Sequence, residues 1–123
     1  MKAAELETLG LRAVACPRWR WLPGMAILGS KGRRVVVIGL SGAPEATSGM
    51  NSRAIEPDEL PDLSSPATRG AVLALTREAH GDPSFVVRCV AGLWYEESNT
   101  RALVARGSDT EAEALVAALE AAP

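Results

Sequence analysis

Few residues in this chain could support acid–base or nucleophilic chemistry. His80 is the single histidine, so any Ser-His-Asp or Cys-His site would have to include it. Ser41 lies in the run Gly39–Gly42, which lacks the glycine spacing of a nucleophile elbow. Asp82 is only two residues from His80, which is poor spacing for a residue that orients the imidazole ring. The sequence therefore predicts no catalytic residue, and we expect His80 near a helix C-terminus, where positive charge is favourable.

Two further runs have the composition of binding motifs but not their spacing. Gly29–Gly32 contains a lysine between glycines, but a phosphate-binding loop precedes a helix and here we expect a strand. Four acidic residues over 56–62 could supply oxygen ligands, yet their spacing fits no EF-hand. These are Glu56, Asp58, Glu59 and Asp62. We expect a hairpin tip and a solvated acidic loop, and we predict no cofactor, no metal site and no enzyme activity.

The best candidate interaction surface combines basic residues with tryptophan. Its members are Arg18, Trp19, Arg20, Trp21, Lys31, Arg33 and Arg34. Arginine and tryptophan are typical anchors of protein–protein interfaces. The same residue types can also pair phosphates and stack on bases, as nucleic-acid-binding proteins do. A simpler interpretation places the two tryptophans in the core or in an interface.

The charge of the chain is unevenly distributed along the sequence. Residues 1–34 carry a net charge of +5 and the remainder a net charge of −7. Such asymmetry would give a basic face for an acidic partner, or would vanish if the two parts interleave on folding. The whole chain has a pI near 5.4, whereas autonomous nucleic-acid-binding domains are usually basic.

Length and composition limit the class of protein. With 123 residues, 47% hydrophobic and 23% charged, the chain fits one globular domain over 1–123 with a real core. No apolar run approaches the length of a membrane span, and the N-terminal run 1–10 does not resemble a secretion signal. Cys16 and Cys89 are therefore expected as free thiols in a reducing compartment, which we take to be the cytoplasm.

The elements expected in the first half are a helix, three strands and a loop. The apolar spacing over 3–15 predicts a short helix, and alternation of arginine with tryptophan over 18–21 predicts a strand. The apolar runs 25–28 and 34–40 predict a hairpin. Val35–Ile38 is β-branched throughout, so we expect it in mid-sheet with helices on both faces. Residues 41–65 show no periodicity and predict a long irregular loop.

The second half carries clearer boundaries. Ser65, Pro66 and Gly81 predict a helix over 66–80, with Gly70 allowing close approach to the sheet. Strands are expected over 84–90, 93–95 and 101–105. A capping box starting at Ser108 predicts the beginning of the last helix, which runs to about residue 121.

These elements predict an α+β fold in the order α-β-β-β-loop-α-β-β-β-α. A mainly antiparallel sheet of about five to six strands would pack with two long helices and a short N-terminal helix as a layered sandwich. A free sheet edge or an exposed tryptophan pair could form the interface of a homodimer, and the sequence leaves the oligomeric state open.

Several runs resemble a group of small phage- and prophage-encoded proteins of unknown function. They are Trp19–Trp21, Pro23–Met25, Leu60–Leu63, Pro66–Thr68, Arg77–Ala79, Gly81–Pro83 and Thr110–Leu119. The chain is also loosely similar to the phage α/β/α-sandwich domain. The shared motifs are helix caps, turns and a helix stripe, so the resemblance carries over no active-site residue.

Two functions follow as expectations. The resemblance implies an accessory protein without catalytic activity that binds a host or phage protein in the cytoplasm of a bacterial host, and that inhibits a defence or regulatory system. The alternative is a small nucleic-acid-binding module that uses the basic N-terminal third.

Overall fold

A computed structural model of the chain describes residues 1–29, 35–39, 44–48, 51–98 and 107–123. Within these residues the chain forms three helices and five antiparallel strands, an α+β fold in the order α-β-β-β-α-β-β-α. The elements are α1 (Ala3–Val14), β1 (Val36–Ile38), β2 (Glu45–Ser48), β3 (Asn51–Ala54), α2 (Pro66–His80), β4 (Val86–Val90), β5 (Leu93–Glu97) and α3 (Glu111–Glu120). The predicted fold class is confirmed, while the strand expected over 101–105 lies outside the described residues.

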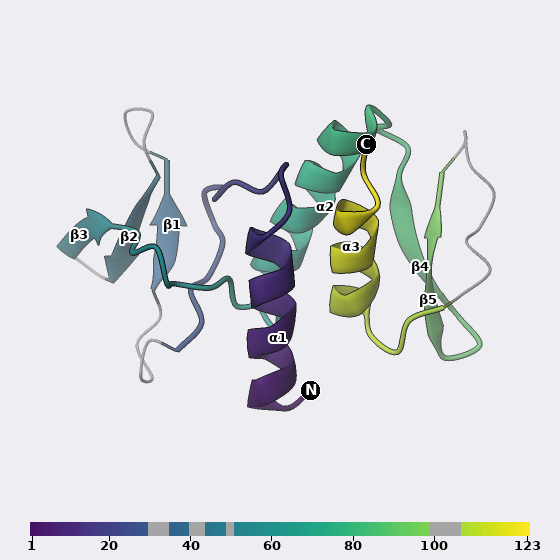
Figure 1. The fold of residues 1–123 in the computed structure, drawn as a ribbon, viewed down its shortest axis with the longest axis horizontal. Helices are drawn as coiled ribbons and strands as arrows, with labels where there is room; N and C mark the ends of the chain where they lie inside the picture. The colour runs from purple at the N-terminus through teal and green to yellow at the C-terminus, as the bar shows by residue number, and fades with distance from the viewer. Residues whose placement is uncertain (30–34, 40–43, 49–50, 99–106) are drawn as a thin grey trace.

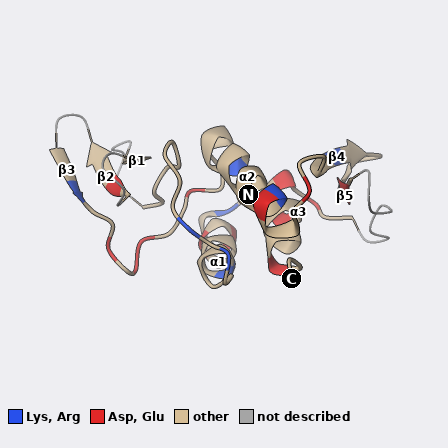
Figure 2. Ribbon diagram, turned by 90° about the horizontal axis from the view of Figure 1, so that it is seen from above, with Lys and Arg blue, Asp and Glu red and all other residues tan. Residues whose placement is uncertain are grey.

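The described strands divide between two small sheets instead of forming one. β1, β2 and β3 form one sheet in that order, and β4 pairs with β5 in the other. The three helices lie between the two sheets (Figures 1 and 2). The prediction that helices cover both faces of the valine-rich strand was therefore wrong, because all three helices lie on one side of the sheet that contains β1 (Figure 1).

The predicted pairing of residues 25–28 with the valine-rich run is confirmed by backbone hydrogen bonds. The Ile27 amide donates to the Val35 carbonyl at 3.0 Å, and the Val37 amide donates to the Met25 carbonyl at 2.8 Å. Val35 and Val37 are buried, whereas the alternate residues Val36 and Ile38 are half-buried. β1 thus has neighbours along both edges but only one face against the core.

The expectation of an irregular loop over 41–65 was wrong for its first part, because β2 and β3 lie there as an antiparallel pair. Glu45 is opposite Ala54, and Ser48 is opposite Asn51. Ala46 is the only buried residue of these two strands, and every residue of β3 is exposed. A polar strand at the edge of a sheet shows no hydrophobic alternation, so its sequence did not indicate a strand.

The boundaries of α2 follow the predicted signals. The Ser65 hydroxyl accepts from the Thr68 amide, Pro66 is the first helical residue, and Gly81 ends the helix with φ +63°. A glycine is favoured there because L-residues avoid the left-handed region. The role expected for Gly70 was wrong, because a side chain at that position would meet no atom within 4 Å.

The cap of α3 lies two residues later than predicted. The Thr110 hydroxyl accepts from the Glu113 amide at 3.1 Å, and the helix begins at Glu111. Ser108 cannot serve as the cap because its backbone pairs with Trp94, with an amide-to-carbonyl distance of 2.9 Å. The predicted apolar stripe is confirmed, since Ala112, Leu115, Val116 and Leu119 are buried.

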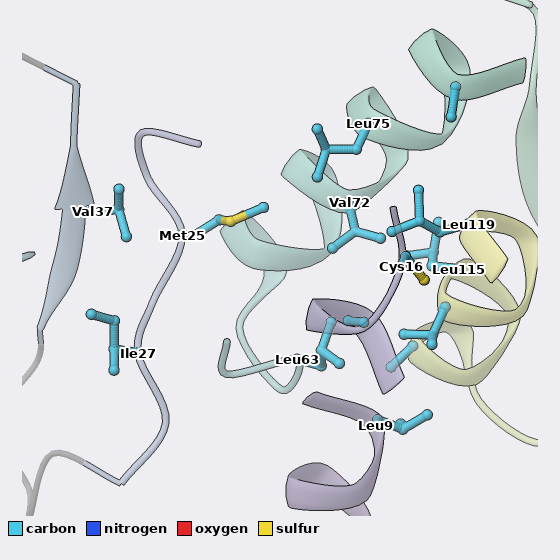
Figure 3. Packing of buried hydrophobic residues seen from close by; sticks show 14 of the residues in the cluster. Leu9, Cys16, Met25, Ile27, Val37, Leu63, Val72, Leu75, Leu115 and Leu119 are labelled. Carbon is cyan, nitrogen blue, oxygen red and sulfur yellow. The ribbon is translucent and has the colours of Figure 1, made fainter. Parts of the chain in front are cut away.

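The core lies where the helices meet and extends to β1 (Figure 3). Leu115 and Leu119 of α3 contribute to the same cluster as Val72 and Leu75 of α2, and Met25 continues it toward the sheet. Among the described helices, none has the length and apolar character needed to cross a lipid bilayer.

Candidate interaction surface

The segment that follows α1 is a series of turns, not the strand that the arginine–tryptophan alternation predicted. Pro17 cannot continue the helix because it lacks an amide hydrogen. The Cys16 amide donates to Ala13 at 3.1 Å, and the Trp19 amide donates to the Cys16 carbonyl at 3.0 Å. These bonds bend the chain tightly, so residues 18–21 pass beside α2 without joining a sheet.

Trp19 and Trp21 lie against each other at the border of the core. Their ring centroids are 5.5 Å apart and the ring planes meet at 79°, an edge-to-face arrangement. Both side chains are half-buried and pack against the core cluster. The Trp19 indole nitrogen is buried and has no hydrogen-bond partner in the described part of the chain. The interpretation of the pair as core or interface aromatics therefore fits their position.

Arg18 and Arg20 are exposed on either side of Trp19. The Arg20 Nη2 lies 2.7 Å from Oε2 of Glu78 on α2. The Arg18 Nη2 donates to the backbone carbonyl of Pro123 at 3.4 Å. The hydrogen bond from Arg20 holds the pKa of Glu78 below its usual range, and the charge of Arg18 acts in the same direction.

A pocket of about 250 Å³ lies between this segment and α2. Its wall consists of Pro17, Arg18, Trp19, Arg20, Leu75, Glu78 and Ala79. The pocket therefore joins aromatic, aliphatic and charged groups of both signs. We call Arg18, Trp19, Arg20, Trp21 and Glu78 the Arg-Trp surface.

Sequence reasoning missed Glu78. Glu78 is exposed on α2 and directly precedes the buried Ala79. This position predicts an exposed carboxylate but does not indicate its partner. Lys31, Arg33 and Arg34, the other members of the predicted surface, lie outside the described residues. Their convergence with Arg18 and Arg20 stays a prediction.

The charges of the two ends of the chain interleave on folding. Arg12 lies 2.9 Å from Glu113 and 2.6 Å from Glu120 on α3, measured between guanidinium and carboxylate atoms. Figure 2 shows basic and acidic residues side by side on the helices. The positive excess of the N-terminal segment is thus compensated in part by C-terminal carboxylates.

His80 has a packing role in the structure. Its Nε2 lies 2.8 Å from the Ala118 carbonyl, and its ring stacks on Phe85 with centroids 5.1 Å apart. Asp82 accepts from the amide and hydroxyl of Ser84 instead of orienting the imidazole. His80 therefore connects the end of α2 to α3, while Ser41 lies outside the described residues.

The acidic run over 56–62 is held by hydrogen bonds of its own. Both guanidinium nitrogens Nη1 and Nη2 of Arg53 contact the carboxylate of Glu59, the second at 2.8 Å. Asp62 accepts from the amide of Ser64 at 3.0 Å. In the ranges that the structure describes, no three His, Cys, Asp or Glu side chains gather as a metal site would require.

A larger pocket of about 960 Å³ lies between α1, α3 and the residues just before α3. Thr8, Arg12, Glu96, Asp109 and Glu113 are among its lining residues. Arg12 on α1 and Glu113 on α3 hydrogen-bond to each other, so this polar pair of the lining joins the two helices.

Comparisons with known proteins give no relative for this chain. No family model, no curated protein and no solved structure matches it. The resemblance to phage proteins thus stays a prediction.

Proposed function

We propose that this chain is a non-catalytic protein that acts by binding another protein through the Arg-Trp surface. The observation that carries the proposal is the juxtaposition of exposed Arg18 and Arg20 with the edge-to-face tryptophan pair beside a pocket of about 250 Å³. Arginine and tryptophan contribute most often to the binding energy of protein interfaces. The pocket offers a place for one partner side chain.

The mixed charge of the surface favours a protein partner over a nucleic acid. Arg20 is paired with Glu78 at 2.7 Å, so a phosphate approaching Arg20 would also meet a carboxylate. A protein partner can match both signs at once, because its own side chains carry both. Nucleic-acid binding through the basic N-terminal third stays the alternative, and its signature would be an affinity that falls steeply with salt.

The biological role that we propose comes from the resemblance alone. It is that of a phage-type accessory protein that acts in the cytoplasm of a bacterial host and inhibits a defence or regulatory system by covering a surface of a host or phage protein. Self-association as a homodimer is a further arrangement that the same surface could support.

Binding with matched arginine variants tests the proposal. The tagged protein is incubated with bacterial lysate, and the bound proteins are quantified for the parent, for Arg18→Ala with Arg20→Ala, and for Arg53→Ala. Arg53 is the control because it is also exposed and paired with a glutamate, but lies on β3 (Figure 1). We expect the double variant to retain less than about a tenth of the partner and the control to retain it fully.

Equal recovery of bound protein by the parent, the double variant and the Arg53→Ala control would contradict the proposal. Recovery that disappears after nuclease treatment, or binding to DNA or RNA that falls steeply between about 50 and 200 mM salt, would favour the nucleic-acid alternative.

A further inference from the structure

Along the outer edge of β4, Val87 and Cys89 have no backbone partner among the described residues. On β5, the Trp94 amide donates to the Ser108 carbonyl at 2.8 Å, and the Trp94 carbonyl accepts from the Ser108 amide at 2.9 Å. Trp94 therefore points its backbone groups away from β4. Cys89 is directly opposite Trp94, so in an antiparallel ladder its backbone groups point away from β5, and those of Val87 do the same.

The turn between the two strands agrees with this assignment. Ala91 has φ +51° and Gly92 has φ +82°, the left-handed pair of a type I′ turn. In such a hairpin the closing pair, Val90 and Leu93, exchanges both hydrogen bonds. The backbone groups of Val90 and Arg88 thus bond to β5, while those of Val87 and Cys89 point outward.

No described residue pairs with the backbone of Val87 or Cys89 along this edge. The start of the edge is covered, because the Arg77 Nε donates to the Phe85 carbonyl at 2.8 Å. Beyond that point no residue in the described ranges pairs with the edge, and Val90 is 47% exposed. A two-stranded sheet with an open edge is a template for a further strand.

A second copy of the chain fits this edge poorly. The antiparallel register that pairs the outward groups of Val87 with those of Cys89 puts Arg88 directly opposite Arg88 of the second copy. Like charges in that position are destabilising. Shifting the register so that Cys89 faces its own counterpart leaves Val87 opposite the turn residue Ala91, which offers no strand backbone. Shifting it so that Val87 faces its own counterpart leaves Cys89 opposite Phe85, whose amide and carbonyl are already bonded to Asp82 and Arg77.

We propose that the outer edge of β4 binds an extended segment of another protein that carries an acidic side chain opposite Arg88. Arg88 and its neighbours Val86 and Val90 share one face of the strand, so the segment would have apolar residues flanking the acid at every second position. Arg88 already donates to Glu97 at 2.9 Å, but Glu97 lies on β5, on the side of Arg88 away from an added strand. A guanidinium has five N–H donors and can hold a second carboxylate on its other side. This surface is distinct from the Arg-Trp surface and does not depend on it.

A charge-swapped pair of peptides tests the proposal. The first is an acetylated and amidated peptide Thr-Val-Thr-Glu-Thr-Val-Thr, and the second has lysine in place of the glutamate. Binding is followed by the NMR signals and hydrogen exchange of the backbone amides. We expect the glutamate peptide to bind about tenfold more tightly. It should slow exchange at Val87 and Cys89, and leave the already bonded amides of Arg88 and Val90 little changed.

Two variants give independent checks. Arg88→Glu should reverse the preference toward the lysine peptide. Cys89→Pro removes one outward amide, which an edge strand tolerates, and should abolish binding without disturbing the parent spectrum elsewhere. Absence of binding by the glutamate peptide at about 1 mM, equal affinities for the two peptides, or binding that moves only the signals of Arg18–Trp21 would each overturn the proposal.

Discussion

Arg12 and Glu120 form a two-pronged ion pair that joins the first helix to the last. The Arg12 Nη2 lies 2.6 Å from Oε1 of Glu120, and the Arg12 Nε donates to Oε2 at 3.2 Å. Together with Glu113, Glu120 raises the pKa of the Arg12 guanidinium above its usual range. Both helices therefore depend on one side chain for the polar part of their contact.

Substitution of Arg12 is expected to destabilise the fold modestly. Arg12→Ala should lower the free energy of unfolding by about 1 kcal/mol, because the pair is partly exposed but bidentate. Arg12→Lys should recover only part of this, because an ammonium lacks the planar two-nitrogen fork that matches a carboxylate. Urea unfolding measures the effect, and a double-mutant cycle with Glu120→Gln isolates the pair. If the losses in the free energy of unfolding for Arg12→Ala and Glu120→Gln are additive, the Arg12–Glu120 pair contributes no coupling energy.

The cap of α3 offers a second test. Thr110→Ala removes the acceptor for the Glu113 amide and should cost about 1 kcal/mol of stability. Ser108→Ala should change it by less than about 0.5 kcal/mol, because Ser108 pairs through its backbone. If thermal or urea unfolding shows a larger loss of stability for Ser108→Ala than for Thr110→Ala, Ser108 is the N-cap, as the sequence predicted.

The two cysteines should react at different rates. Cys16 is buried and its Sγ donates to the Arg12 carbonyl at 3.4 Å, and burial raises the pKa of its thiol. Cys89 is exposed on β4, and both are free in the structure. Under native conditions we expect the Cys89 thiol to react with a disulfide reagent at least about tenfold faster than the Cys16 thiol. Cys89→Ser should remove the fast phase, whereas its persistence would show that Cys16 is accessible.

The Arg20–Glu78 pair predicts a pH-dependent contribution. The pKa of Glu78 is lowered in the folded protein, so the stabilisation is present above the usual glutamate value, about 4.3, and is lost as the pH falls through the folded value. In an NMR titration, Arg20→Ala should raise the pKa of Glu78, while Arg53→Ala should raise only that of Glu59. An unchanged titration of Glu78 in the Arg20 variant would disprove the pair in solution.

Core packing can be checked with two leucines. Leu115 is fully buried in α3, and Leu115→Ala should lower the free energy of unfolding by about 2–5 kcal/mol. Leu11 on α1 is 54% exposed, and Leu11→Ala should change it by less than about 0.5 kcal/mol. Similar losses for both variants would contradict the packing of α3 against α2.

The sequence was most informative where the structural signal is local. Ser65, Pro66 and Gly81 set the ends of α2 through contacts within a few residues, so their types suffice. Ser108 misled because its backbone is engaged by Trp94, a partner fourteen residues earlier that no local pattern reveals. The polar strands β2 and β3 were missed for the same reason, since pairing alone makes them strands.

The candidate surface was predictable only in part. The residue types of Arg18–Trp21 pointed to an interface, but their alternation indicated a strand that the turn at Cys16–Trp19 prevents. Glu78 could not be found, because any of the acids in the chain could have paired with Arg20. Its role follows from the passage of the segment beside α2.

The packing of α1 on α3 also has a kinetic consequence. Among the described strands, each pair joins neighbours in the chain, so the ladders close short loops. The Arg12–Glu120 contact instead spans 108 residues. Closing so long a loop is entropically costly, and contacts of this kind slow folding. Docking of the first helix is therefore expected to come late, after the remainder of the chain has largely assembled.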